Sequence, residues 1–160
     1  MYKIYALIIC LTLVFLPSCA EARYTDAIDC SAITDAIRSK ILTPEPYSEY
    51  QSEDIAFMLD YTDKFDSYSI IYSTSSDDIG EVGVFHAISQ EESLELVEDI
   101  AEYLNDIKEE KGAFVRNYLQ GEEEKLDAAT VKRFGNYVVF TVLEPSKSNA
   151  VFAQIEKTLK

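Results

Sequence analysis

Residues 130–143 read TVKRFGNYVVFTVL, and this stretch decides the fold. Its two halves are rich in β-branched and aromatic residues, which favour strands. Gly135-Asn136 lies between them, and these residue types accept the positive φ angles that a two-residue hairpin turn requires. The stretch therefore predicts a hairpin with strands at 130–134 and 136–143, which ends before Pro145.

A second hairpin is predicted upstream of the first. Ser67 to Thr74 and Glu81 to Ile88 each read as a strand, and the polar run 75–80 between them reads as a loop. Two hairpins predict a four-stranded antiparallel sheet.

Helices are predicted before, between and after the two hairpins. Ser89-Gln90-Glu91-Glu92 is a capping box that opens a long amphipathic helix near 90–119. Its apolar stripe includes Leu94, Val97, Ile100, Leu104 and Ile107 and resumes at Phe114, Val115 and Tyr118. A break at Lys111-Gly112 is the alternative.

The terminal helices have their own start signals. Thr25 or Asp26 can cap the first helix, and Ser146 or Ser148 can cap the last. Residues 122–125 are expected to form a short exposed turn. The fold class is therefore α+β: a four-stranded antiparallel sheet with the long helix and the terminal helices on one face.

The first eighteen residues have the features of an export signal. Lys3 is the only charge before Glu21, and Ile4 to Leu16 is almost entirely apolar. A cationic start followed by a short apolar run is typical of a signal peptide, and the run is shorter than the roughly 20 residues of a membrane span.

The end of that run resembles the bacterial lipobox. Leu16-Pro17-Ser18-Cys19 follows its order of aliphatic, variable, small and Cys. The resemblance implies cleavage before Cys19 and acylation of that residue, so that more than one acyl chain holds the protein stably in a membrane. Ordinary cleavage after Ala20 is the alternative. The predicted organisation is signal peptide 1–18, lipidated tether 19–25 and one α+β domain 26–160, on the extracytoplasmic face of the cell membrane.

Charge and cysteine content restrict the partners. The net charge of −15 becomes −16 without the signal, because Lys3 is the only charged residue in it. This acidity argues against nucleic acid, whose binding depends on Lys and Arg. A basic partner or divalent cations remain open. If Cys19 is acylated, Cys30 is alone and no disulfide can form; otherwise a Cys19–Cys30 bridge is conceivable.

No catalytic residue, metal ligand or cofactor is predicted. His86 is the single histidine and lies in a strand pattern, so it is expected to be non-catalytic. Cys30 lies among isoleucines and is expected to be a small buried hydrophobe, although a pair with His86 stays open.

Two sets of acidic residues are potential calcium ligands. They are Asp60, Asp63 and Asp66, and Asp77, Asp78 and Glu81. Neither set has the spacing of an EF-hand loop, so solvated acidic loops are the favoured interpretation.

Several short motifs together resemble a known family. They are Ile79-Gly80-Glu81-Val82-Gly83-Val84-Phe85, the long helix leading to Phe114 and Tyr118, Leu126-Asp127-Ala128-Ala129-Thr130-Val131, and Phe134-Gly135-Asn136-Tyr137-Val138-Val139. With the signal and the lipid cysteine, they resemble the domain of unknown function 4358 family, found mainly in lipoproteins of Firmicutes, over roughly residues 28–160. The resemblance implies no activity and no catalytic residues.

The expected function is non-catalytic. The chain reads as an interaction module at the cell envelope, held to the membrane through Cys19, that contacts an envelope protein or a wall component. The alternative is a carboxylate-dependent hydrolase of an envelope polymer. A hydrolase needs a concave pocket with two close carboxylates, one with a shifted pKa. A binding module needs an exposed apolar or aromatic patch.

Overall fold

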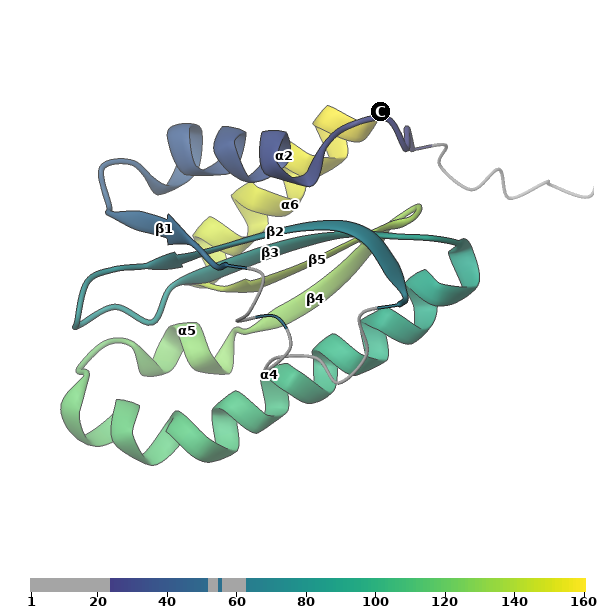
Figure 1. The fold of residues 1–160 in the computed structure, drawn as a ribbon. Helices are drawn as coiled ribbons and strands as arrows, with labels where there is room; N and C mark the ends of the chain where they lie inside the picture. The colour runs from purple at the N-terminus through teal and green to yellow at the C-terminus, as the bar shows by residue number, and fades with distance from the viewer. Residues whose placement is uncertain (1–23, 52–54, 56–62) are drawn as a thin grey trace, which may run out of the picture.

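The centre of the molecule is an antiparallel sheet of five strands in the order β1-β2-β3-β5-β4 (Figure 1). The computed structural model describes residues 24–51, 55 and 63–160. Its elements are α2 (Cys30–Ile37), the π-helical turn η1 (Arg38–Leu42), β1 (Tyr47–Glu49), β2 (Phe65–Ser73), β3 (Glu81–Ala87), α4 (Gln90–Tyr118), α5 (Glu123–Asp127), β4 (Thr130–Phe134), β5 (Tyr137–Val142) and α6 (Pro145–Leu159).

Both expected hairpins are present in this one sheet. Strands β4 and β5 pair from Thr130↔Thr141 to Phe134↔Tyr137, and Gly135 in the turn between them has a φ of 63°. Strands β2 and β3 pair from Phe65 to Tyr72, with an irregularity near Ser67. The hairpin signals therefore predicted the correct pairing.

The expected number of four strands is wrong, because β1 adds a fifth. It pairs with β2 through Tyr47↔Ser73 and Glu49↔Ile71. Three residues are too few to show an alternating pattern, and Pro46 directly precedes them. The sequence therefore carries too little periodic signal for this strand.

The expectation that helices cover one face of the sheet is also wrong. Helices α2 and α6 pack on one face and α4 packs on the other (Figure 1). Alternate residues of a strand point to opposite faces, and in β5 Val139 joins the α2/α6 core while Val138 and Phe140 join the α4 core. Every residue of β5 is buried, so both of its faces require a cover.

The long helix is as predicted. Ser89 caps it by accepting a hydrogen bond from the Glu92 N–H at 3.1 Å, and it runs through Gly112 without a break. Its buried stripe differs from the prediction at both ends, because Leu94, Phe114 and Tyr118 are exposed, whereas Val115 is buried.

The remaining helix starts were placed wrongly. Helix α2 begins at Cys30 after Asp29, not after Thr25 or Asp26. Helix α6 begins at Pro145, whose fixed φ suits the first helical turn. Ser148 is a buried residue inside α6 that bonds the Thr141 hydroxyl at 3.0 Å.

The segment after α4 is a short helix, α5, instead of an exposed turn. Lys125 and Leu126 are buried in it. Leu126 packs with Ile107 and Val115 of α4 in a small separate cluster. This tertiary contact, which local sequence does not reveal, turns the segment into a helix.

On the α4 face of the sheet, the Phe140 ring lies very close to the backbone of Gly83. Gly83 of β3 pairs with Phe140 of β5, and a Cβ on Gly83 would lie 2.1 Å from the Phe140 ring. The ring occupies the space that a side chain would need. The glycine therefore lets a large aromatic residue lie flat across its neighbouring strand.

The predicted signal peptide, Cys19 and residues 19–23 of the tether lie outside the described residues. Among the described helices, none combines the length and the hydrophobicity that a membrane crossing requires.

Candidate functional site

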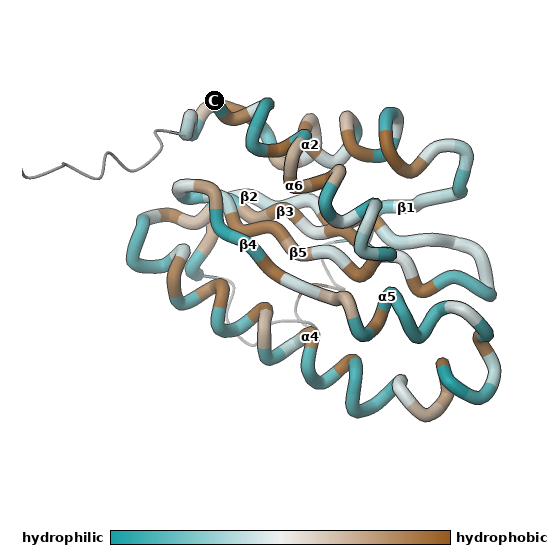
Figure 2. The backbone as a smooth tube through the Cα atoms, turned by 180° about the vertical axis from the view of Figure 1, so that it is seen from behind, coloured by the Kyte–Doolittle hydropathy of each residue, from teal (hydrophilic) through white to brown (hydrophobic). Residues whose placement is uncertain are grey.

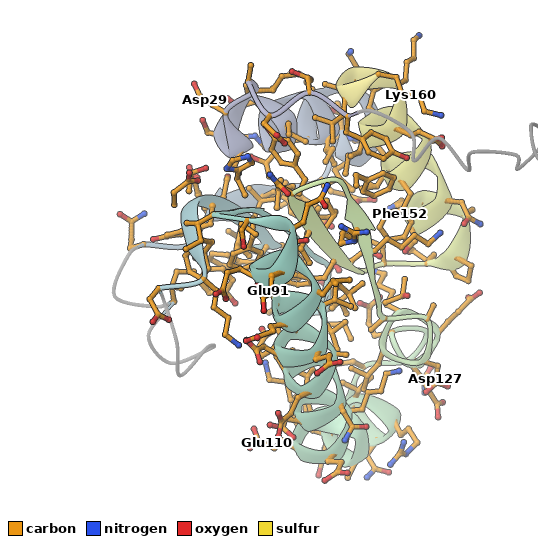
Figure 3. All side chains as sticks on the ribbon, turned by 90° about the vertical axis from the view of Figure 1, so that its right-hand side faces the viewer. Asp29, Glu91, Glu110, Asp127, Phe152 and Lys160 are labelled. Carbon is orange, nitrogen blue, oxygen red and sulfur yellow. The ribbon has the colours of Figure 1, made fainter. Side chains whose placement is uncertain are left out.

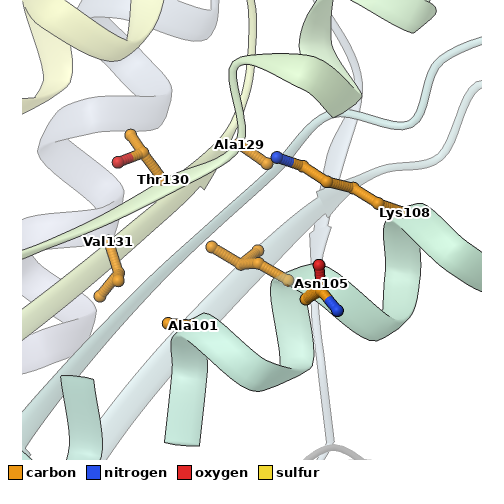
Figure 4. A pocket seen from close by; sticks show the side chains of 7 residues that line it. Ala101, Asn105, Lys108, Ala129, Thr130 and Val131 are labelled. Atoms are coloured by element: carbon orange, nitrogen blue, oxygen red, sulfur yellow. The ribbon is translucent and has the colours of Figure 1, made fainter. Parts of the chain in front are cut away.

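The structure describes a groove between α4 and the edge strand β4 (Figure 4). Its volume is about 220 Å³. The lining residues come from about two turns of the helix and from the start of the strand: Ala101, Leu104, Asn105, Lys108, Ala129, Thr130 and Val131. We refer to this cavity as the α4/β4 groove.

Apolar and polar groups line the groove in similar measure. Leu104 is buried and belongs to the α4-side core, and Ala129 and Val131 pack against that core. At one end Lys108 extends from α4 toward Ala129 (Figure 4), and its Nζ donates to the Asp127 carbonyl at 3.4 Å. No carboxylate is among the lining residues.

The neighbours of His86 hold the start of the described chain against the sheet. Its Nδ1 lies 2.8 Å from Asp66 Oδ1 and its Nε2 lies 3.7 Å from Asp26 Oδ1. The ring packs on Tyr137 with centroids 4.8 Å apart, and the Tyr137 hydroxyl donates to the Ile28 carbonyl at 2.7 Å. These contacts join the start of the described chain to the sheet. The expectation that His86 is non-catalytic stays a prediction.

Cys30 is a buried thiol beside this cluster. Its Sγ lies 3.5 Å from Ser67 Oγ. Burial raises the pKa of Cys30 to about 11, so the residue is protonated at neutral pH. A nucleophilic cysteine needs the opposite shift, and the environment is that of the small buried hydrophobe expected from the sequence.

The second acidic set is not one solvated loop, and that expectation is wrong for two of its three members. Asp77 is exposed, but Asp78 and Glu81 are largely removed from solvent. Asp78 Oδ1 accepts from Lys125 Nζ at 2.8 Å and from the Gly80 N–H at 2.7 Å. Of the first set, Asp60 lies outside the described residues, Asp63 is exposed and Asp66 contacts His86.

Lys125 is the centre of an ionic network. Its Nζ lies 2.8 Å from Asp78, 3.0 Å from Glu122 and 3.6 Å from Glu144. Glu144 also lies 3.6 Å from Lys147, which pairs with Glu45 at 2.6 Å. Although burial alone would lower it, the bonds to Asp78 and Glu122 raise the pKa of Lys125. The network ties α5, the β2–β3 loop and the start of α6 together.

Glu81 is a buried carboxyl with a different neighbourhood. It is 6% exposed, and both carboxylate oxygens accept from the Tyr103 hydroxyl, at 3.2 and 3.4 Å. Burial raises the pKa of Glu81 to about 7, against the opposing effects of the Tyr103 bond and of Lys111. The α4/β4 groove is lined by neither Glu81 nor Tyr103.

Exposed aromatic surface appears where the sequence led us to expect core. The Phe114 and Tyr118 rings lie 5.2 Å apart on the last turns of α4, exposed by 55% and 74%. By contrast, Tyr50 packs against Tyr72, with ring centroids 4.5 Å apart and the rings tilted by 34°.

Metal-ligand geometry is missing from the described part of the chain. Across residues 24–51, 55 and 63–160, no three His, Cys, Asp or Glu side chains are grouped so that they could hold a metal ion.

The comparison with protein families identifies the class. The model of a domain of unknown function (DUF4358) matches residues 48–143, and the chain belongs to that family. The match covers the sheet, α4 and α5 and is shorter than the range 28–160 that the sequence motifs suggested. No curated protein and no solved structure matches the chain.

Proposed function

We propose that this member of the family is a lipid-anchored, extracytoplasmic protein that works as a non-catalytic binding module at the cell envelope. The observation that carries the binding role is the α4/β4 groove, which has an apolar floor with polar groups beside it, is open next to a sheet edge and is free of lining carboxylates. Such a surface suits a partner protein or a wall component better than it suits carboxylate chemistry.

The start of the described chain supports the anchoring. The Thr25 N–H donates to the Leu159 carbonyl at 2.9 Å, and Tyr24 packs edge-on against Phe134. The chain therefore enters the domain beside the end of α6 (Figure 1). Residues 19–23, fully extended, span at most about 17 Å, so a lipid on Cys19 would hold that side of the domain close to the bilayer.

One observation bears on the hydrolase alternative. The raised pKa of Glu81 is the kind of shift that a general acid needs. However, this carboxyl is enclosed by the core, and its hydrogen-bond donor is a tyrosine of α4 instead of a second carboxylate. The arrangement therefore favours binding over hydrolysis.

The anchoring is tested by the mass of the mature N-terminal peptide after expression in a bacterium that processes lipoproteins. We expect a peptide that begins at acylated Cys19 and a protein that stays with membranes through a high-salt wash. Cys19→Ser should abolish acylation. Cys30→Ser is the matched control and should leave it intact, because Cys30 is buried. An unmodified peptide that begins at Glu21 would contradict the proposal.

The binding role is tested by photo-crosslinking in the producing cells. A benzoylphenylalanine at Asn105 stands at the groove, and one at Lys157 stands on the exposed side of α6. We expect a discrete crosslinked species from position 105 that position 157 does not give. The same species from both positions, or none from position 105, would refute the groove as a binding surface.

A further inference from the structure

The strand beside the groove is a sheet edge. Among the described strands, β4 pairs with β5 alone. In a two-residue hairpin the closing pair, here Phe134 and Tyr137, exchanges hydrogen bonds, and such pairs alternate along the ladder. Lys132 and Thr130 therefore bond toward β5, whereas the N–H and C=O of Val131 point away from the sheet. In Figure 2 this strand runs between α6 and α4.

The size of the groove indicates what can enter it. Pockets for drug-sized ligands have volumes of about 300–1,000 Å³, and this groove has about 220 Å³. Side chains of a neighbouring strand would project into it, because strands lie about 4.8 Å apart and alternate residues face the same side. The Val131 side chain already faces α4, so every second residue of an added strand would do the same.

A lysine lies on each side of β4. Lys132 is exposed on the face toward α6, and its Nζ lies 4.3 Å above the Phe152 ring. Figure 3 shows Phe152 on the part of α6 near the β4–β5 hairpin. Lys108 adds a second positive charge at the groove, on a protein whose net charge is −15. An added strand would therefore meet lysines here.

The charges distinguish between two molecules that could pair with β4: a second copy of this chain and a different protein. A second copy of the chain would bring together two proteins of charge −15. A partner segment with acidic residues would instead complement the lysines. Charge complementarity thus favours a different protein over self-association.

We infer that β4 accepts an extended segment of a partner protein as a sixth strand. The segment places small apolar side chains toward the α4/β4 groove and acidic side chains toward Lys132. Strand addition uses main-chain hydrogen bonds for affinity and alternate side chains for specificity. This inference deepens the proposed binding role and rests on it.

The test is an NMR titration of the protein as the producing cell makes it, purified in detergent micelles. The probe is an end-blocked peptide of alternating glutamate and valine, six residues long, and its control has lysine in place of glutamate. We expect the acidic peptide to shift the Val131 and Leu104 amides, to slow exchange of the Val131 N–H, and to bind at least tenfold more tightly than the basic peptide.

Two variants give independent readings. Val131→Pro removes the outward N–H and leaves the bonds of Lys132 and Thr130 to β5, so we expect at least tenfold weaker binding. Lys132→Glu changes only an exposed side chain, and it should make the basic peptide the better ligand. If Val131→Pro fails to fold, Lys132→Glu and the exchange measurement still decide.

Three outcomes would overturn the inference: no shift of β4 amides at millimolar peptide, equal binding of both peptides, or shifts confined to another surface. In those cases Lys132 acts as a charge that protects the edge from aggregation. A crosslink at Asn105 that the acidic peptide does not compete would leave the binding role standing and remove strand addition alone.

Discussion

Asp78 and Glu81 lie three residues apart on the β2–β3 hairpin, and the fold treats their charges in opposite ways. Asp78 faces an ammonium group at 2.8 Å and a backbone N–H at 2.7 Å. Although burial would raise it, these bonds lower the pKa of Asp78. Glu81 faces a tyrosine hydroxyl inside the core, and burial raises its pKa to about 7.

The difference shows that burial alone does not set the cost of an acidic residue. A charge held by a cation with good geometry is tolerated, whereas a charge without one is driven toward its neutral form. Asp78 should therefore stabilise the folded protein at neutral pH. Glu81 should destabilise it there and become neutral as the pH falls.

The largest expected effect comes from removing the cation. Lys125→Met leaves Asp78, Glu122 and Glu144 without the ammonium that lies within 3.6 Å of each. Breaking a buried ion pair from one side costs about 3–5 kcal/mol, and we expect a loss of that size in the free energy of unfolding at pH 7. Urea denaturation measures it.

Lys160→Met is the control for that experiment. Lys160 pairs with Glu156 one helical turn away, and both side chains are about half exposed. An exposed pair of this kind contributes little to stability because solvent screens it. Equal losses in the free energy of unfolding for the two variants would mean that the buried Lys125 network stabilises the fold no more than an exposed ion pair does.

The second effect is the pH dependence of stability that Glu81 causes, which has the opposite sign to the dependence that Asp78 causes. Between the usual pKa of 4.5 and about 7, the folded protein binds a proton at Glu81 that the unfolded chain does not. The Glu81 contribution therefore makes stability rise as the pH falls from 8 to 5, by about 1.4 kcal/mol for each pH unit at most. Below that range, stability is lost as Asp78 is protonated in its turn.

Glu81→Gln removes this titration while keeping the shape of the side chain. We expect the variant to be about 1–3 kcal/mol more stable than the wild type at pH 8, and this gain to fade toward pH 5. Asp77→Asn, on the exposed part of the same hairpin, is the matched control and should not raise the stability at pH 8. Parallel profiles for wild type and Glu81→Gln would contradict the buried, cation-free state of Glu81.

The same pair of residues shows where sequence reasoning succeeded and where it stopped. The hairpins and α4 were predictable because Gly135-Asn136, the strand patterns and the Ser89 cap are local signals. Asp77, Asp78 and Glu81 read as one acidic cluster, since their partners Lys125 and Tyr103 are 47 and 22 residues away. Only the tertiary packing of α4 and α5 assigns those partners.

The placement of the helices on both faces of the sheet and the position of the α4/β4 groove also depend on contacts between distant parts of the chain. The stretch Tyr137 to Leu143 is apolar except for Thr141, as is typical of a strand buried on both faces, but the predicted fold placed all helices on one face of the sheet. The α4/β4 groove had no local signal, because Ala101 and Lys108 meet Ala129 and Val131 only after the chain has turned back through α5. Its residue types are ordinary for a helix and a strand.

The smallest expected effect tests the contact between Tyr103 and Glu81. Tyr103→Phe removes the hydroxyl that donates to both carboxylate oxygens and keeps the ring packed on Phe140, with centroids 5.8 Å apart. The charged form of Glu81 loses more from this change than the neutral form, because hydrogen bonds to a charged acceptor are the stronger ones. We therefore expect a loss of about 1–2 kcal/mol at pH 8 and a smaller loss at pH 5, both from urea denaturation. Tyr118→Phe, on the exposed end of the same helix, should change neither value. A loss that is equal at the two pH values would show that the Tyr103 hydroxyl acts through packing alone and does not sense the charge of Glu81.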